Sequence, residues 1–301
     1  MIKPKSSNNS NSLNNLNNLS SPNNLNNRTL ENRNKFNLDY RIGFIGVLPD
    51  CSLGLPGFMS IVQEVSLFHT LSIPQAFDYY DKMGWVWVLT HWHVDIYDYP
   101  RVGDDINIAT WPVRFKGYFG ERGFDAIDAN GRVLLAANSN WVLLDKTKKA
   151  PVRPDEYICN KYGATHPFLL ERDFSLPKLG GLGGSDNLDG RDGLNGHCGL
   201  DGLDYFKPLS RHTYTTLRRD IDTNMHVNNS KYIEWVYCYL PDDIYYGYRA
   251  RHLKVAYKKE LMLGDVVEIR LFKRHIGEEV EIFALIEKDG VVVTEVYTIW
   301  Q

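Results

Sequence analysis

The sequence predicts an α+β fold built from two similar units, each a helical segment packed on a curved antiparallel sheet. Three observations lead to this prediction. Two blocks of the chain repeat the same landmarks at the same spacing, and each block places helical periodicity ahead of a run of alternating strands. Two low-complexity segments precede and separate the blocks. The length of 301 residues suits two domains.

The internal repeat is carried by two spacings that both blocks keep. A histidine stands twelve residues before a Gly-Asp pair, and a later glycine stands ten residues before a tryptophan. These landmarks are His91, Gly103, Gly131 and Trp141 in the first block, and His252, Gly264, Gly290 and Trp300 in the second. Since both spacings stay in step, the two blocks are predicted to share one fold.

Helical segments begin each block. Apolar residues at helical spacing predict a helix over 57–69 and, after a proline, a second over 75–83. In the second block the pattern predicts a helix over 229–240 with one apolar face. Asn228 and Asn229 are candidate N-caps of that helix.

Strands follow the helices in both blocks. The runs rich in β-branched and aromatic residues cover 106–115, 123–128 and 132–144 in the first block, and 266–273, 279–287 and 291–300 in the second. The tetrapeptides DANG and EKDG between them predict hairpin turns, because glycine accepts a positive φ. A helix followed by a meander therefore occurs twice.

Two segments lack the composition of a folded core. Asparagine supplies thirteen of the first 34 residues, so 1–35 is predicted to be a disordered tail. Nine glycines fall within 178–204, too irregularly for a calcium-binding repeat, which favours a linker over 166–205 with a flexible Gly-rich insertion. The predicted domains are then 36–165 and 206–301.

Charge and cysteine content exclude several classes. A net charge of −3 and a pI near 6.3 argue against a nucleic-acid binder. The most apolar window is interrupted by prolines and an aspartate, so no membrane span is expected. The four cysteines form no CxxC pair, and the N-terminus lacks a secretory signal. We expect a cytoplasmic protein, in a bacterium rather than in the plastid stroma.

Polar residues gather just ahead of the helix in the second block. An extended approach would place Asp222, Asn224 and His226 on one face. The helix N-terminus directs its N–H groups and positive dipole end at the same point. An imidazole or carboxylate that activates water and an amide that stabilises an oxyanion suit acyl chemistry. A helix-capping Asx turn explains the string equally well.

The first block does not keep this polar set. The matching stretch reads DCSLGLPGF, with Ser52 and Gly54 as the expected counterparts of Asn224 and His226. Tyr99 stands opposite Glu260 in the repeat. This asymmetry favours chemistry in the second block and binding in the first. Divergence of the two copies without a change of function would give the same asymmetry.

At this point the sequence resembles a known family. The segment from Asp222 to Trp235 (DTNMHVNNSKYIEW) is similar to the signature of acyl-acyl-carrier-protein thioesterases of plant plastids and bacteria. AANSNWVLLDKTKKAPVRPDEY from Ala136 and VAYKKELMLGD from Val255 resemble further landmarks of that family, in the same order. The resemblance covers both blocks and omits the tail and the Gly-rich insertion.

The resemblance implies a tandem (double) hotdog fold, in which each curved antiparallel sheet wraps around a central helix. It implies hydrolysis of fatty acyl-carrier-protein thioesters, which terminates fatty acid elongation, with Asp222, Asn224, His226 and Glu260 as catalytic residues. Plant members follow the glutamate with a cysteine, whereas this chain has Leu261. Water activated by Glu260 or His226 is therefore the expected nucleophile, without cofactor or metal.

The first block is expected to bind the acyl chain and the carrier. The candidate acyl-binding residues are Met59, Gln63 and Phe68, together with Asn229 at the second helix. The compact basic patch KTKKAPVR is a candidate docking surface for an acidic acyl carrier protein, through Lys146, Lys148, Lys149 and Arg153. The alternative for this patch is a solvated loop.

Other functions remain open at this point. An acyl-coenzyme A thioesterase, a dehydratase and a non-catalytic acyl-binding hotdog protein all fit the same fold. His91 and His93 could offer two imidazoles on one strand face, but without an acidic or cysteine partner at ligand spacing a structural role is favoured. A homodimer is compatible with the sequence.

Overall fold

The computed structural model describes residues 35–164, 167–179 and 206–301. The asparagine-rich tail up to residue 34 and the Gly-rich segment 180–205 lie outside the described residues, so the predictions of disorder and flexibility there stay predictions.

The first unit contains three helices and six strands within the described chain. In chain order these are β1 (Phe36–Arg41), α2 (Leu55–Ser72), α3 (Ala76–Met83), β2 (Trp85–Ile96), β3 (Asp105–Lys116), β4 (Phe119–Asp128), β5 (Val133–Asp145), β6 (Ala150–Pro151) and α4 (Glu156–Tyr162).

The second unit repeats this plan in shorter form. Its elements are β7 (Lys207–Thr215), a 3-10 turn (Arg218–Asp220), α5 (Asn229–Cys238), α6 (Asp242–Gly247), β8 (Ala250–Tyr257), β9 (Val266–Ile276), β10 (Glu279–Lys288) and β11 (Val291–Trp300). The predicted helices and meander strands are confirmed, with ends displaced by a few residues. Helix α2 begins before residue 57 because Pro56 fits the first helical turn, where its missing N–H is not needed.

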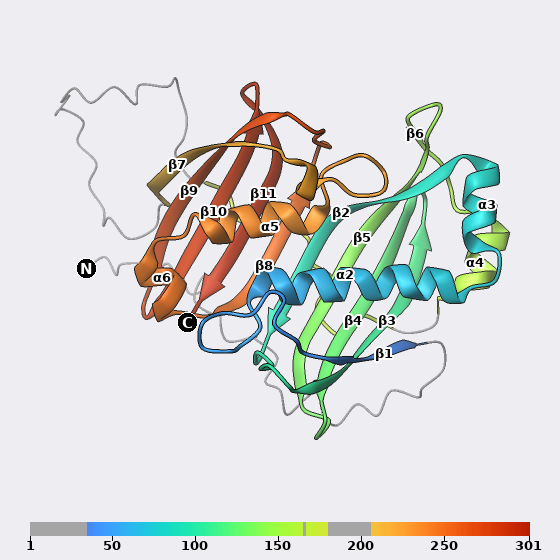
Figure 1. The fold of residues 1–301 in the computed structure, drawn as a ribbon. Helices are drawn as coiled ribbons and strands as arrows, with labels where there is room; N and C mark the ends of the chain where they lie inside the picture. Colours follow the sequence, from blue (N-terminus) through green and yellow to red (C-terminus); the bar gives the residue numbers. More distant parts are fainter. Residues whose placement is uncertain (1–34, 165–166, 180–205) are drawn as a thin grey trace, which may run out of the picture.

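The two units share one continuous sheet. Its strand order is β1-β3-β4-β5-β2-β8-β11-β10-β9-β7, and the antiparallel pair β2–β8 joins the units. Helices α2 and α5 lie across the same face of this sheet (Figure 1). The α+β prediction is confirmed, and the two predicted sheets are halves of a single one.

The main core lies between these helices and the sheet. Helix α2 buries Phe58 and Val62, and α5 buries Ile233, against sheet residues such as Val94 of β2 and Leu253 of β8. These five belong to one apolar cluster that runs through both units, so burial of apolar surface holds the units together. Among the described helices, none is long and apolar enough to cross a membrane.

The opposite face of the sheet is covered by residues 167–179, which we name the cover segment. Trp111 Nε1 donates to the carbonyl of Pro167 at 3.1 Å, and Lys254 Nζ donates to the Asp173 carboxylate at 2.6 Å. This part of the predicted linker is therefore packed on both units. It shields polar side chains of β2 and β8 from solvent.

Candidate active site

The loop that carries Asp222, Asn224 and His226 is a closed turn. An isolated bridge pairs Ile221 with Val227, and the Asp222 N–H donates to the His226 carbonyl at 2.8 Å. The predicted extended approach with alternating side chains is wrong, because this reversal of the chain needs a residue of positive φ. Met225 provides it at φ 66°.

Asp222 holds the turn through its side chain. Its Oδ1 accepts the Asn224 N–H at 2.8 Å and the His226 N–H at 3.4 Å. This is the Asx-turn arrangement that the sequence left open. The carboxylate thus organises the backbone that presents the other two side chains, and its contribution to the site is positional.

His226 and Glu260 meet at the mouth of the turn. His226 Nε2 lies 3.2 Å from Glu260 Oε2, with the two side chains 32% and 51% exposed. Asn224 is exposed beside them. The imidazole and the carboxylate are close enough to share a proton, and both reach solvent, where a water and a substrate can approach.

The start of helix α5 borders this turn. Asn228 is the N-cap, and its Oδ1 accepts the Ser230 N–H at 2.9 Å. Gln63 of α2 reaches across from the first unit and donates through Nε2 to the same oxygen at 3.4 Å. Asn229, the first residue of α5, is half-buried, and its carbonyl accepts from the Tyr257 hydroxyl at 2.9 Å. The positive end of the helix therefore faces the polar set.

Leu261 fixes the position of Glu260. The Val227 N–H donates to the Leu261 carbonyl at 2.8 Å, which ties the turn to the segment that carries the glutamate. The Leu261 side chain is fully buried. Cys238 is exposed and lies at the opposite end of α5, roughly 13 Å along the axis from the first residue.

The first unit repeats the turn in its backbone. An isolated bridge pairs Val47 with Leu53, Cys51 has φ 65°, and the Leu53 N–H donates to the Pro100 carbonyl at 2.8 Å. These match the bridge, the φ of Met225 and the Leu261 contact of the second unit. The carbonyl contact places Tyr99 opposite Glu260, as predicted.

The same match corrects the predicted register of the turn by two residues. The Leu48 N–H donates to the Ser52 carbonyl at 2.8 Å, as that of Asp222 does to His226. Ser52 is therefore the counterpart of His226, and Asp50 that of Asn224. Gly54, the N-cap of α2, corresponds to Asn228.

Asp50 has a structural environment in the first unit. It accepts from Ser52 Oγ at 2.6 Å and forms an ion pair with Arg249 of the second unit. The hydrogen bonds from Ser52, and the pairing with Arg249, lower the pKa of Asp50 to about 2. The first copy of the turn thus joins the two units, and it lacks both the imidazole and the carboxylate of the second copy.

A cavity opens in the first unit beside α2. It is open to solvent, and its lining is partly aromatic and partly polar. The lining residues are Ser66, Thr70, Trp87, Pro112, Phe115, Gly120, Glu121, Arg122, Trp141 and Tyr162. Ser66 and Thr70 follow Gln63 at helical spacing on α2, so one helix face leads from the candidate site toward the cavity.

The other predicted acyl-binding residues lie apart from the cavity lining. Met59 is buried in the main core, and Phe68 is half-buried on α2. The sequence patterns do not predict this lining, and among its residues only Trp141 is a landmark of the repeat. These residues are scattered along the sequence, on β2, β3, β4, β5 and two helices, and only the folded structure brings them together.

The predicted docking residues form an exposed patch around the β5–β6 turn. Lys148 and Lys149 are exposed, and Arg153 lies over the Tyr118 ring at 5.8 Å. Lys146 Nζ lies 3.4 Å from Asp81 and Lys148 Nζ lies 3.5 Å from Asp145. Lys146 and Lys148 are 48% and 77% exposed in these pairs, so both cations can still meet an acidic partner.

The fold is a double hotdog, in which two units each place a helix on one continuous sheet. Within the described residues, the Asp-Asn-His-Glu set at the start of α5 forms a candidate acid–base site. The family model for the N-terminal domain of acyl-ACP thioesterases matches residues 33–162, and that for the C-terminal domain matches residues 206–301. The chain belongs to the acyl-ACP thioesterase family.

Curated relatives include a chloroplastic oleoyl-acyl carrier protein thioesterase of Coriandrum sativum, 25% identical over 77% of this chain and 60% of its own length. A chloroplastic dodecanoyl-[acyl-carrier-protein] hydrolase of Umbellularia californica is 27% identical over 77% of this chain and 58% of its own length. This chain thus spans somewhat more than half the length of these relatives.

Solved structures agree on the fold. The 12:0-ACP thioesterase from Umbellularia californica matches with a TM-score of 0.71 and 22% identity, over 89% of this chain and 94% of the other. An acyl-ACP thioesterase from Bacteroides thetaiotaomicron matches with a TM-score of 0.69 and 20% identity, over 89% and 98%. Both show the tandem hotdog architecture for this chain.

Proposed function

We propose that this protein hydrolyses fatty acyl-acyl-carrier-protein thioesters to free fatty acid and carrier protein, at one site in the second unit. The observation that carries the proposal is the contact of 3.2 Å between His226 and Glu260 beside the start of α5, in a member of the acyl-ACP thioesterase family. The first unit supports binding rather than chemistry, since Ser52 and Tyr99 stand in the place of these two residues.

In the proposed reaction, a water that binds at the side of the His226–Glu260 pair loses a proton to one of them as its oxygen attacks the thioester carbon. The negative charge that develops on the carbonyl oxygen is stabilised by the Asn224 amide and the N-terminal turn of α5. The C–S bond then breaks, and the leaving thiolate takes the proton back from the His226–Glu260 pair. Atoms and charges balance without a cofactor.

The acyl chain is proposed to run along α2 into the first unit. Gln63 touches the N-cap of α5, and the cavity lined by Ser66 and Thr70 begins one turn further along the same helix. A rise of about 1.5 Å per residue places Thr70 roughly 10 Å beyond Gln63. This path has the direction and scale of a fatty acyl chain leaving the thioester.

The carrier protein is proposed to dock through the basic patch of Lys146, Lys148, Lys149 and Arg153. Complementary charge raises the rate of encounter with an acidic partner more than it raises the final affinity. The patch lies on the first unit, so a carrier seated there would present its thioester across the boundary between the units.

An assay of acyl-carrier-protein and acyl-coenzyme A thioesters over a range of chain lengths tests the proposal, with released acid and free thiol measured together. Faster release from the carrier-protein series is the expected result. Faster release from coenzyme A would replace the proposed substrate by that alternative. Acyl binding without release of acid would make the chain a non-catalytic acyl-binding protein.

A further inference from the structure

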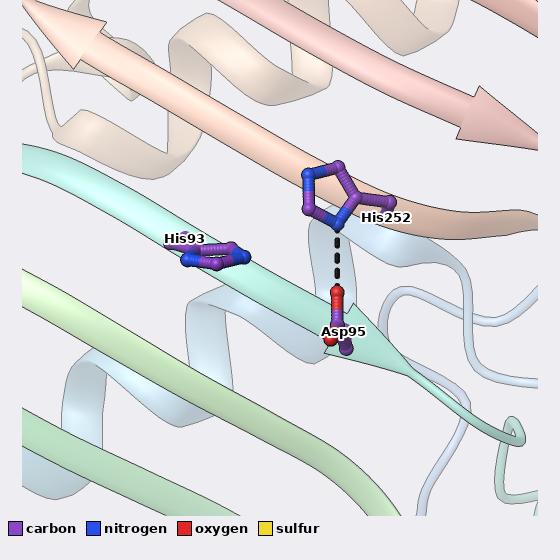
Figure 2. Close-up of side chains that lie close together, drawn as sticks. All are labelled: His93, Asp95 and His252. Atoms are coloured by element: carbon purple, nitrogen blue, oxygen red, sulfur yellow. Dashed lines mark hydrogen bonds and ion pairs between the residues drawn. The ribbon is translucent and has the colours of Figure 1, made fainter. Parts of the chain in front are cut away.

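Three potential metal ligands meet where the two units join. His93 and Asp95 come from β2 and His252 comes from β8, and one ligand atom from each lies within 4.8 Å of the other two. Figure 2 shows the Asp95 carboxylate and the His252 ring in contact, with a ring edge of His93 directed toward them. This is the acidic partner that the sequence spacing of the histidines did not reveal.

Strand geometry explains the meeting. His93 and Asp95 are two residues apart on β2, so their side chains share one face, while Val94 between them points into the main core. His252 lies directly opposite Asp95 in the β2–β8 register. The three side chains therefore gather on the face that the cover segment shields from solvent.

The His93 side chain is buried, since the residue is only 7% exposed. Its Nδ1 is fully buried and unpaired in the part of the chain that the structure describes. Burying an unpaired polar group costs about 1–3 kcal/mol, so such a group calls for an explanation. By contrast, His252 Nδ1 and Asp95 Oδ1 are 2.7 Å apart, and Asp95 is 6% exposed.

The charges around the cluster favour a cation. The nearby Lys254 ammonium is matched by Asp173 at 2.6 Å. The acidic member of the cluster, Asp95, is 6% exposed and offers carboxylate oxygens to a cation.

We propose that His93, Asp95 and His252 bind one divalent transition-metal ion of the Zn²⁺ type, which links the two units across the β2–β8 pair. Two imidazoles and a carboxylate are ligands that zinc accepts, and they leave a fourth position for water. Bonds of about 2.1 Å in a tetrahedral site require ligand atoms about 3.4 Å apart. The ligand atoms lie within 4.8 Å of one another, and His252 Nδ1 and Asp95 Oδ1 are 2.7 Å apart.

The test uses the full chain, freed of metal by a chelator and then titrated with Zn²⁺ and Co²⁺. We expect one equivalent of Zn²⁺ by elemental analysis, a rise in Tm on adding Zn²⁺, and visible absorption bands with Co²⁺ that Zn²⁺ abolishes. None of these readouts depends on thioester hydrolysis, so failure of the proposed enzyme function would leave this test intact.

Matched variants make the test specific. His93→Gln and Asp95→Asn keep the side chains polar and similar in size, and each should weaken Zn²⁺ binding by more than the roughly 10- to 100-fold expected for an outer-shell contact. His275→Gln, an exposed histidine on β9, should bind Zn²⁺ as the parent does. Zinc binding that is absent from the parent, or unchanged in His93→Gln, would overturn the proposal.

Discussion

His226 Nε2 lies 3.2 Å from Glu260 Oε2, although the two residues come from different segments on either side of β8. The backbone contact from Val227 to Leu261 holds these segments in register. An imidazole in contact with a carboxylate can pass a proton from one to the other. Since neither side chain belongs to the core, their chemistry can be tested without unfolding the protein.

Glu260→Gln and His226→Asn are each expected to lower kcat for acyl-carrier-protein hydrolysis by about 100- to 10,000-fold, the usual range for removal of an acid–base group. Both changes keep the size and polarity of the side chain, so Tm should stay within about 2 °C of the parent. Steady-state kinetics and thermal unfolding measure the two effects. Thr223→Ala, exposed in the same turn, is the control.

The outcome against the assignment is equally specific. Near-parent turnover in both variants would remove Glu260 and His226 from the mechanism. If only one variant loses turnover, that residue is the base and the reaction does not depend on the other.

Asp222→Ala is expected to lower kcat by about 100-fold through misplacement of its neighbours, because its Oδ1 binds the backbone N–H groups of Asn224 and His226. Asp222→Asn keeps an acceptor oxygen and should retain at least about a tenth of the activity. Measuring kcat for both variants shows whether the hydrogen bonds or the charge of Asp222 is needed. Equal loss in both would mean that the negative charge of Asp222, rather than its hydrogen bonds, serves the reaction.

The two copies of the turn offer a matched pair of variants. Asp50 and Asn224 occupy equivalent positions, but Asp50 pairs with Ser52 and Arg249, whereas Asn224 is exposed beside His226. Asp50→Ala should cost about 1 kcal/mol of stability and leave kcat unchanged. Asn224→Ala should lower kcat about 10- to 1,000-fold and leave Tm unchanged. If Asp50→Ala lowered kcat and Asn224→Ala lowered only stability, the assignment of catalysis to the second unit would be contradicted.

Much of the fold could be predicted from local pattern. Helix α5, its Asn228 cap and the meander strands follow from periodicity and turn residues, which act over a few positions. The internal repeat identified the shared fold of the two blocks. The pairing of β2 with β8 has no such local pattern in the sequence, because it depends on how the two folded units pack against each other.

The candidate site was predicted in composition but not in conformation. Asp222, Asn224 and His226 were read as an alternating strand, whereas Met225 at positive φ folds them into a turn. The register of the first copy was wrong for the same reason, since a turn is aligned by its hydrogen bonds rather than by counting residues. The grouping of His93, Asp95 and His252 could not be predicted from spacing, because His252 lies 157 positions from Asp95 and only the β2–β8 pairing brings it beside the two β2 residues.

Stability toward acid should depend on His69. Its ring is buried, and Arg122 Nη1 lies 2.8 Å from its Nδ1. Burial and the Arg122 charge lower the pKa of His69 to about 3, below the ordinary 6.5. Between pH 6.5 and 3, His69 is therefore protonated in the unfolded chain but not in the folded chain. The free energy of unfolding falls as the pH falls through that window.

The slope gives the measurable quantity. One such histidine contributes up to about 1.4 kcal/mol per pH unit in that window. His69→Gln keeps an acceptor for Arg122 and removes the titration, so urea unfolding at pH 6 and pH 4 should show a smaller loss than in the parent. His275→Gln, which changes an exposed histidine, should keep the parent slope. If His69→Gln lost as much stability between pH 6 and pH 4 as the parent, His69 would not be the source of the acid sensitivity.

Charge reversal tests where the carrier docks. Lys148 is 77% exposed on the β5–β6 turn, whereas Lys207 is exposed on β7 at the far edge of the sheet. At low salt, Lys148→Glu should raise KM for an acyl-carrier-protein by about threefold without changing kcat, because a surface charge acts on encounter. Reversal of all four cations should raise it at least about tenfold. Salt near 0.5 M should erase both effects.

The control for this prediction is Lys207→Glu, which should have the KM of the parent at every salt concentration. A KM that responds to Lys207 but not to Lys148 would move the docking surface to the second unit.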